Sequence, residues 1–352
     1  MSEPTSTFPA TLEWDDQPQP GVWVIPPPRQ RWWLYALFLV LTLFSTMVVG
    51  ARMQFNFVHR QSVFSLNDAS LSLFPIVWIA QQPARLLLGL PFSLTLMFIL
   101  FAHEMGHYLY ARHYHVYATP PFFVPFPSLI GTLGAFIRIK SPIPSRAALF
   151  DIGIAGPIAG FIPACIALVY GLSISHPIAR AAASEIQLGF PLVFYLAAGL
   201  LHSAVPLDAL SLHPIAAAAW VGMFATALNL LPGGQLDGGH IVFSISPRLH
   251  RWISLLTIVA LVPLGYYFWT GWFLWTVMLA ITLRHPRVPR YPDVTGRRSA
   301  LALFAALMLV LTFAPAPFTH SSGREVWPQI RDGSRDTLHD LRDEVRHLLH
   351  RK

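Results

Sequence analysis

The stretch FAHEMGHYLYARHYH, from Phe101 to His115, carries four histidines and one glutamate at the end of a strongly apolar run. The residues just before the first histidine, LTLMFILFA, are apolar enough for the interior of a lipid bilayer. An acidic side chain near the centre of a bilayer costs about 2.5–3.5 kcal/mol on insertion scales. The pattern therefore predicts a membrane helix whose polar residues have a partner or a chemical task.

Within this stretch, residues 103–107 read H-E-x-x-H. Residues four apart share one face of a helix, so His103 and His107 can bind one zinc ion through their imidazole nitrogens. Glu104 then stands beside the metal, placed to take a proton from zinc-bound water, whose pKa the metal lowers towards neutrality. The alternative is a structural pair of histidines at the membrane interface, hydrogen-bonded to headgroups or to neighbouring helices.

Two further histidines follow the motif. His113 stands at the position of a third zinc ligand in the longer pattern H-E-x-x-H-x-x-G-x-x-H. That pattern needs a glycine where this chain has Tyr110, so the helix is expected to run on and to turn His113 elsewhere. We expect His113 and His115 to be interfacial or loop residues.

The composition of the 352-residue chain points to lipid as its main solvent. It is 54% hydrophobic and 12% charged, whereas about 25% of the residues of a soluble domain are charged. The net charge of +7 comes from short basic clusters between apolar blocks, which is typical of membrane proteins and not of nucleic-acid binders. Cys165 is the only cysteine, which excludes an internal disulfide and a thiol-rich zinc site.

Apolar runs long enough to form membrane-spanning helices recur along the chain. The sequence predicts an all-α polytopic integral membrane protein with about six to eight transmembrane helices and the bilayer as its partner. Two more apolar stretches, Leu71 to Ala80 and Phe190 to Val205, are ambiguous. The candidate spans are Trp32–Gly50, Pro91–Ala111, Ile152–Leu172, Pro214–Leu231, Trp252–Phe268, Trp272–Leu283 (short) and Ala300–Ala314.

These spans divide the chain into five regions. They are a flexible proline-rich tail at 1–31, a first span with its connection at 32–90, a metal-site core at 91–246, further spans at 247–318 and a charged tail at 319–352. The charged tail has the apolar spacing of a surface helix. Basic clusters before the first span, after the second and before the last predict that these three regions lie in the cytoplasm.

Two histidines leave a tetrahedral zinc ion one protein ligand short, with the fourth position open to water. Three acids lie within or beside apolar blocks, namely Asp151, Asp208 and Asp237. Asp237 stands in NLLPGGQLDGGH, where Pro232 and two glycines should break the preceding helix. A broken helix is tolerated in a membrane only where protein or a hydrated cavity surrounds it. Asp237 is therefore the best candidate, and the alternative is an ordinary turn aspartate.

Topology sets a condition for this ligand set. The histidines lie near the C-terminal end of one span, and Asp237 follows the C-terminal end of another. The two spans must therefore run parallel, with an odd number of crossings between them. Ile152 to Leu172 supplies one crossing, so Phe190 to Val205 is expected to lie flat or re-enter.

HEMGH at 103–107 and LDG at 236–238 together resemble the site-2 protease family of intramembrane zinc metalloproteases, in particular its bacterial and chloroplast branch. Asn229 and Pro232 complete the similar arrangement N-x-x-P-x-x-x-L-D-G. GTLGAFIRIKSPIPSR and DIGIAGPIAG, between the two blocks, are also similar to that branch. The resemblance covers Leu96 to about Ser246 and does not extend to either end of the chain.

The resemblance implies one zinc ion bound by His103, His107 and Asp237, with Glu104 as the general base. It also implies that Asn229 positions the substrate or the unwound helix. The expected activity is peptide-bond hydrolysis in or near transmembrane segments of membrane-protein substrates. The expected location is the bacterial inner membrane, with the active site towards the cytoplasm.

A helical substrate must unwind before its amides can be attacked, and a strand edge can supply the hydrogen bonds that it loses. GTLGAFIRIK, Gly131 to Lys140, alternates from Ala135 onwards and is expected to form a small re-entrant β-hairpin near the active site. Gly131, Gly134 and Phe136 are its candidate substrate-binding residues, since glycine permits close backbone approach. The alternative is a plain surface hairpin.

Two other classes of protein remain open at this stage. A membrane scaffold or chaperone would bind clients through the hairpin without cutting them, so that its function would survive His107→Ala. A transporter would line an ion path with His103, Glu104 and Asp237. The absence of an internal sequence repeat argues against a transporter.

Overall fold

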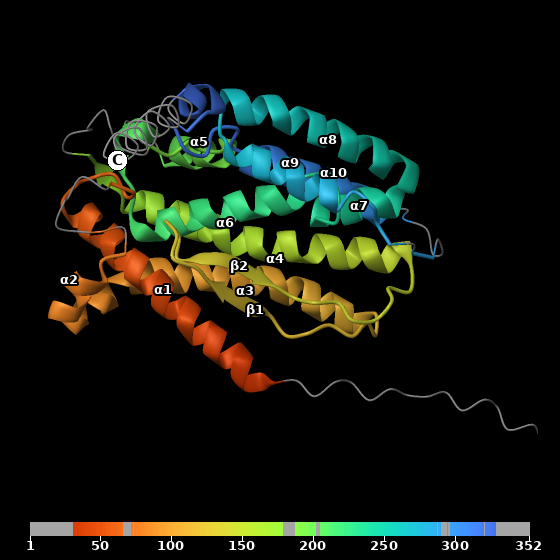
Figure 1. Ribbon diagram of the computed structural model, residues 1–352, viewed down its shortest axis with the longest axis horizontal. Coiled ribbons are helices and arrows are strands. Elements are labelled where there is room, and N and C mark those ends of the chain that lie inside the picture. The colour runs from red at the N-terminus through yellow and green to blue at the C-terminus, as the bar shows by residue number, and fades with distance from the viewer. Residues whose placement is uncertain are drawn as a thin grey trace, which may run out of the picture. The chain divides into compact units, whose positions relative to one another are not determined.

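The computed structural model describes residues 31–328, apart from 66–71, 73, 179–186, 202–204, 287, 290–293, 295 and 320. The described chain is mostly helical, with two small two-stranded sheets (Figure 1). In chain order its elements are α1 (Trp32–Val58), α2 (Ile76–Gln81), η1 (Pro83–Gly89), α3 (Leu90–His113), β1 (Phe122–Pro125), β2 (Thr132–Phe136), α4 (Arg146–Ser173), β3 (His176–Pro177), α5 (Leu192–Leu200), η2 (Leu207–Ala209), β4 (Leu210–Ser211), α6 (Pro214–Leu230), α7 (Asp237–Ile245), α8 (Pro247–Tyr267), α9 (Gly271–Ile281) and α10 (Arg297–Thr312).

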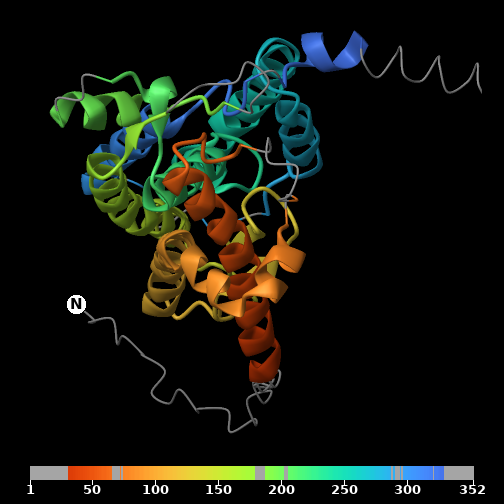
Figure 2. The ribbon, with the colours of Figure 1, turned by 90° about the vertical axis from the view of Figure 1, so that its left-hand side faces the viewer.

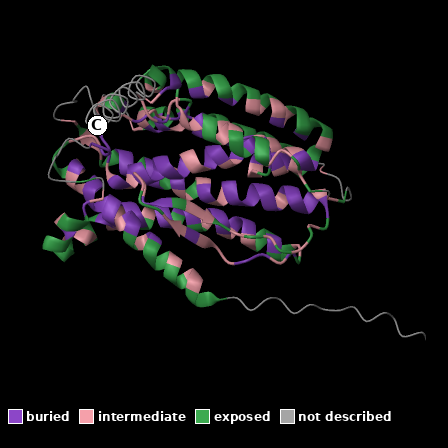
Figure 3. Ribbon diagram, viewed as in Figure 1, coloured by how far each residue is buried: buried purple, intermediate pink, exposed green. Residues whose placement is uncertain are grey.

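Four helical segments of the described residues are long and apolar enough to cross a membrane. The mostly helical architecture predicted from the sequence is confirmed at this level. Large apolar side chains such as Trp252 of α8 and Ile281 of α9 are exposed, as expected of a surface that faces lipid (Figure 3). The first segment is α1, the second is η1 together with α3, the third is α4 and the fourth is α8. Helices α6 and α9 are also apolar but shorter.

The core of the fold is the packing of α4 between α3 and α6 (Figure 1). Small residues allow the close approach: a Cβ atom on Gly171 of α4 would lie only 2.4 Å from the backbone nitrogen of Ala216 in α6. Residues Ala216 to Ala219 are fully buried. At about 25 Å, α6 is shorter than a bilayer core of about 30 Å. It is an internal helix, enclosed by other helices.

Helix α1 runs eight residues beyond the predicted end at Gly50, to Val58. Its last turns carry Arg52 and Asn56, which are buried. The Arg52 guanidinium donates to the Ser65 carbonyl at 2.9 Å and 3.2 Å, and the Asn56 amide donates to the same carbonyl at 3.1 Å. The following loop thus supplies hydrogen-bond acceptors for polar side chains that lie beyond the predicted end of this helix. Figure 2 shows α2 beside α1, where Ile79 packs against Val48.

The described residues of the ambiguous stretch Phe190 to Val205 form one helix, the nine-residue α5, Leu192–Leu200. Nine residues of helix span about 14 Å, half of what a bilayer core requires. The prediction that this stretch does not cross alone is therefore confirmed for its described residues. The other ambiguous stretch yields the short helix α2. Residues 1–30 and 329–352 lie outside the described residues, so the two terminal tails and the five-region division stay predictions.

The predicted hairpin forms, and β1 and β2 pair antiparallel, with Phe123 opposite Ala135. The predicted strand is longer than β2, but its continuation still pairs with the chain before β1. The backbone N–H of Thr119 donates to the Arg138 carbonyl at 2.9 Å, and that of Lys140 donates to the Tyr117 carbonyl at 2.8 Å. From Ala135 to Lys140 half-buried and exposed residues alternate as expected.

Gly171→Val should lower the midpoint of thermal unfolding in detergent. Its side chain would enter the α4–α6 contact, and overpacking of this kind costs roughly 1–3 kcal/mol. Gly199→Ala in α5 is the matched control, because a Cβ atom there meets nothing within 4 Å. It should leave the midpoint unchanged or raise it, and a lower midpoint in the control alone would contradict the packing.

Candidate metal centre

Two histidines of α3 and the first residue of α7 bring three potential ligand atoms together. The Nε2 atoms of His103 and His107 are 3.1 Å apart, and Asp237 Oδ2 lies 3.3 Å from each of them. Donor atoms around a tetrahedral zinc ion, at bond lengths of about 2.0–2.1 Å, are about 3.3 Å apart. The three atoms therefore form a triangle of the size that zinc requires. Among the described residues they are the one His, Cys, Asp or Glu group with metal-binding geometry.

Asp237 reaches the histidines because the chain folds back sharply after α6. Helix α6 ends at Leu230, and α7 begins at Asp237 itself. Gly234 adopts a left-handed conformation, with φ of +58°, and a Cβ atom on Gly238 would lie 2.1 Å from the Leu230 carbonyl oxygen. The predicted break in the helix is confirmed, and Gly234 and Gly238 occupy positions that disfavour any side chain.

Helix α4 supports both imidazole rings from the other side. A Cβ atom on Gly156 would lie 2.1 Å from Nε2 of His107, and one on Gly160 would lie 3.0 Å from Cβ of His103. His107 Nδ1 lies 2.7 Å from the Ile152 carbonyl oxygen. This carbonyl can only accept, so Nδ1 carries the proton and the Nε2 lone pair faces the triangle. A carbonyl behind a histidine is the usual second support of a metal ligand.

Glu104 is buried beside the triangle without belonging to it. It lines a cavity of about 260 Å³ and a neighbouring one of about 150 Å³. The backbone of Ile137, just beyond β2, hydrogen-bonds its carboxylate. Glu104 is thus held in place by the hairpin with an open space in front of it.

Asn229, on the last turn of α6, also lines both cavities. Its Nδ2 atom lies 3.3 Å from His103 Nε2. The side-chain amide therefore borders the same corner of the triangle as the histidine.

The three hairpin residues expected to bind substrate lie in different places. Phe136 lines the larger cavity and Gly134 the smaller one. Gly131 lines neither of the two and instead packs on α1, where its carbonyl accepts a hydrogen bond of 2.6 Å from Ser45 Oγ. Its φ of +81° and the nearby Ser45 carbonyl leave no room for a side chain. Gly131 anchors the hairpin turn on α1.

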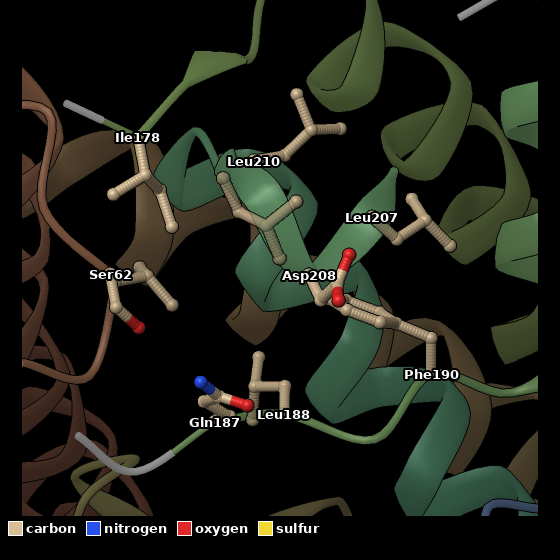
Figure 4. A pocket seen from close by; sticks show the side chains of 10 residues that line it. Ser62, Ile178, Gln187, Leu188, Phe190, Leu207, Asp208 and Leu210 are labelled. Carbon is tan, nitrogen blue, oxygen red and sulfur yellow. The ribbon is translucent and has the colours of Figure 1, made fainter. Parts of the chain in front are cut away.

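The two other candidate acids lie apart from the triangle. Asp151 forms an ion pair of 2.7 Å with Arg298 of α10. Asp208 belongs to the wall of a small cavity of about 30 Å³, together with Leu207, Leu210 and Phe190 (Figure 4). No residue of that cavity lines the space in front of Glu104.

The two extra histidines stay outside the metal site, as predicted. His113 is the last residue of α3, and its ring packs on Tyr110 and Tyr114. His115 follows in a left-handed conformation with φ of +54°.

Some residues of the site carry no signal that identifies their role in the sequence. The small-residue spacing of Gly156 and Gly160 predicts close helix packing. It does not predict that these two glycines contact the histidines of the site. His240 lines the larger cavity, and its Nδ1 lies 2.8 Å from Nε2 of His285. The Ile152 carbonyl and the Ile137 backbone could not be found from side-chain identities at all.

This combination of a helical H-E-x-x-H pair, a carboxylate that completes the triangle and a buried glutamate has the geometry of a metallopeptidase site. The sequence profile of peptidase family M50 matches residues 91–266, half of the chain and all of the site. The chain belongs to this family, the site-2 protease family.

Curated relatives agree with this assignment. The chain is 29% identical over 302 residues to "Probable zinc metalloprotease EGY1, chloroplastic" of Arabidopsis thaliana, covering 80% of this chain and 53% of the relative. It is 32% identical over 239 residues to EGY2 of the same plant, covering 65% and 42% respectively. It is 30% identical over 301 residues to EGY1 of rice, covering 80% and 51%. The chain thus spans about half the length of the curated relatives it matches.

Asp237→Asn should greatly reduce the zinc content of the purified protein, because a neutral amide is a far weaker zinc ligand than a carboxylate. Elemental analysis by mass spectrometry gives the zinc-to-protein ratio. Asp208→Asn, in the wall of the separate cavity, is the matched control and should keep the ratio of the parent protein. Equal zinc content in the Asp237 variant would remove this residue from the metal site.

Gly156→Ala should also lower zinc content, because the new methyl group would displace the His107 ring. The effect should exceed that of Gly160→Ala, whose methyl group meets His103 at 3.0 Å rather than 2.1 Å. The midpoint of thermal unfolding should be measured for both variants, so that loss of zinc can be separated from unfolding. The reverse order of the two effects would contradict the supporting role of Gly156.

Proposed function

We propose that this chain is an intramembrane zinc metalloprotease, which hydrolyses peptide bonds in or near the transmembrane segments of other membrane proteins. The observation that carries the proposal is the triangle of His103, His107 and Asp237 beside the buried carboxylate of Glu104. Membership of family M50 supports it. Each chain would hold one zinc ion, bound by these three residues.

Zinc at this position would supply Lewis-acid activation of water and of the scissile carbonyl group. Glu104 then acts as general base: it takes the proton of the attacking water and passes it to the leaving amine. The Ile137 backbone hydrogen-bonds this carboxylate, which lines the cavity. The Glu104 carboxylate forms no ion pair with any other described residue, which leaves it available for this proton transfer.

Asn229 also has a role in the proposed reaction. When the His103 Nε2 lone pair binds the metal, the Asn229 amide loses its partner and can donate into the cavity. A donor of this kind stabilises the negative charge that develops on the carbonyl oxygen of the substrate.

The free edge of β2 provides a docking place for an unwound substrate. Backbone groups alternate sides along a strand, and those of Arg138 and Lys140 point towards Tyr117 and Thr119. The backbone groups of Ala135 and Ile137 therefore point to the opposite side of the strand. In agreement with this, the Ile137 backbone hydrogen-bonds Glu104. A substrate strand that pairs with Ala135 would pass between the two cavities, directly in front of Glu104.

The site lies among helices of membrane-crossing length, which supports substrates that are themselves membrane proteins. We propose about six to eight crossings in all, and the four long and two shorter apolar helices would account for six of them. The basic residues around the hairpin, including Arg112, Arg138 and Lys140, support an active site on the cytoplasmic side of a bacterial inner membrane. The chloroplast location in the relatives' names is a property of those proteins.

Glu104→Gln should abolish cleavage of a single-span reporter membrane protein while zinc stays bound. Removal of a general base costs typically 10²–10⁴-fold in rate, whereas the three ligands are untouched. The measurement combines reporter cleavage in liposomes with zinc analysis of the same sample. Glu325→Gln, far along the chain, serves as control.

Two results of additional measurements would favour the other classes of protein. Unchanged client binding and cell function after both Glu104→Gln and His107→Ala would indicate a scaffold or chaperone. Ion flux across the liposome membrane that survives Glu104→Gln would indicate a transporter.

Ala135→Pro should lower kcat/KM for the reporter at least tenfold, because proline removes the N–H that the free edge of β2 would donate to substrate. Ala135→Val is the control, since it changes the side chain and keeps the N–H. Equal activity of the proline variant and the parent protein, at equal zinc content, would contradict docking at this edge.

A further inference from the structure

A second and larger cavity lies on the other side of α3, away from the metal centre. Its volume is about 890 Å³, and its lining comes from α3, α4 and α10. It shares no lining residue with the cavity in front of Glu104. Between the two, α3 and α4 touch: a Cβ atom on Gly106 would lie 2.4 Å from the Ala155 carbonyl oxygen. The proposed protease activity therefore does not account for this groove.

The mouth of the groove is positively charged. Arg298 donates from Nε and Nη2 to the two carboxylate oxygens of Asp151, at 2.8 Å and 2.7 Å. The hydroxyl of Tyr114 also donates to Asp151. These bonds neutralise one arginine, and its Nη1 group forms no hydrogen bond with the described residues. The neighbouring Arg297 is exposed and has no ion-pair partner among the described residues.

The body of the groove is apolar and follows one face of α4. Ile154, Ile158 and Ile162 form its floor at helical spacing, and Leu109 and Leu301 form the sides. Ile162 and Leu109 are more than half exposed, at 56% and 55%. From Asp151 to Ile162 the floor is about 16 Å long at 1.5 Å per residue. Half of a bilayer core of about 30 Å is the depth of one leaflet, so the groove matches a single leaflet.

We propose that this groove binds one anionic phospholipid of the surrounding membrane. The phosphate lies at Arg297 and at the free Nη1 of Arg298, and an acyl chain lies along the isoleucine floor. Basic pockets between membrane helices favour anionic headgroups, and arginine is well suited to phosphate. A partner helix fits less well, because it would cross both leaflets, whereas the groove ends halfway and carries its charge at one end.

Native mass spectrometry of the full chain can test this site. The protein is released from nanodiscs that contain equimolar phosphatidylglycerol and phosphatidylcholine with identical acyl chains. The parent protein should retain one phosphatidylglycerol in preference to phosphatidylcholine. Arg297→Gln should lower that preference about fivefold, the factor expected for one arginine near a charged membrane surface. Ile162→Trp should fill the deep end and remove the bound lipid of either kind.

Each variant has a matched control. Arg251→Gln removes another exposed arginine near the start of α8, and Ile166→Trp places the same indole one turn further along the same face of α4, outside the groove. Both should bind lipid as the parent protein does. Equal retention of the two lipids by the parent protein, or equal losses in variants and controls, would overturn the proposal. So would a dimer that Ile162→Trp dissociates, since the occupant would then be a second chain. Zinc content should not change in any of these variants, so the outcome is independent of the proposed protease activity.

Discussion

The close approach of α4 to α3 is the constraint on which the metal site depends. Two imidazoles on a free helix could point in many directions, and an acid from another helix would rarely meet both. The glycines of α4 remove that freedom, because Gly156 and Gly160 leave only enough space for the rings of His107 and His103. The Ile152 carbonyl then fixes the proton on one nitrogen of His107. Contacts with the α4 backbone thus restrict the positions of both histidine rings in the triangle of candidate ligand atoms.

Backbone contacts also satisfy several other buried polar groups of this apolar chain. Arg52 and Asn56 are buried, yet each donates to carbonyl groups of the loop that follows α1. Asp151 is paired with Arg298 and thereby joins α10 to α4. In a membrane, an unsatisfied polar group costs several kcal/mol, which explains why these residues lie in contact with one another or with backbone. Glu104 differs from them, since open space remains in front of its carboxylate.

The hairpin connects the site to its surroundings. Gly131 anchors one end of β2 on α1, and Ile137 holds Glu104 at the other end. The strand between them has one edge paired with β1 and the other turned towards the two cavities. An edge that is normally a risk for aggregation is enclosed here, within reach of the residues proposed to cut a peptide.

The sequence by itself determined the apolar helices, the histidine pair, the break before Asp237 and the strand after Gly131. Each of these rests on local patterns: a period of 3.6 or 2, proline with glycine, or a charge where lipid disfavours it. The sequence also limited the third ligand to three acids, and the parallel arrangement of two spans favoured Asp237. Only the tertiary structure brings Asp237 to the two histidines, whereas Asp151 meets Arg298 and Asp208 lines a separate cavity. The tertiary structure alone decided that Gly131 binds α1, that Ile137 bonds Glu104 and that Gly156 faces His107. Each of these contacts joins the backbone of one residue to a side chain far away in the chain, and no residue type or spacing encodes a backbone atom's neighbour.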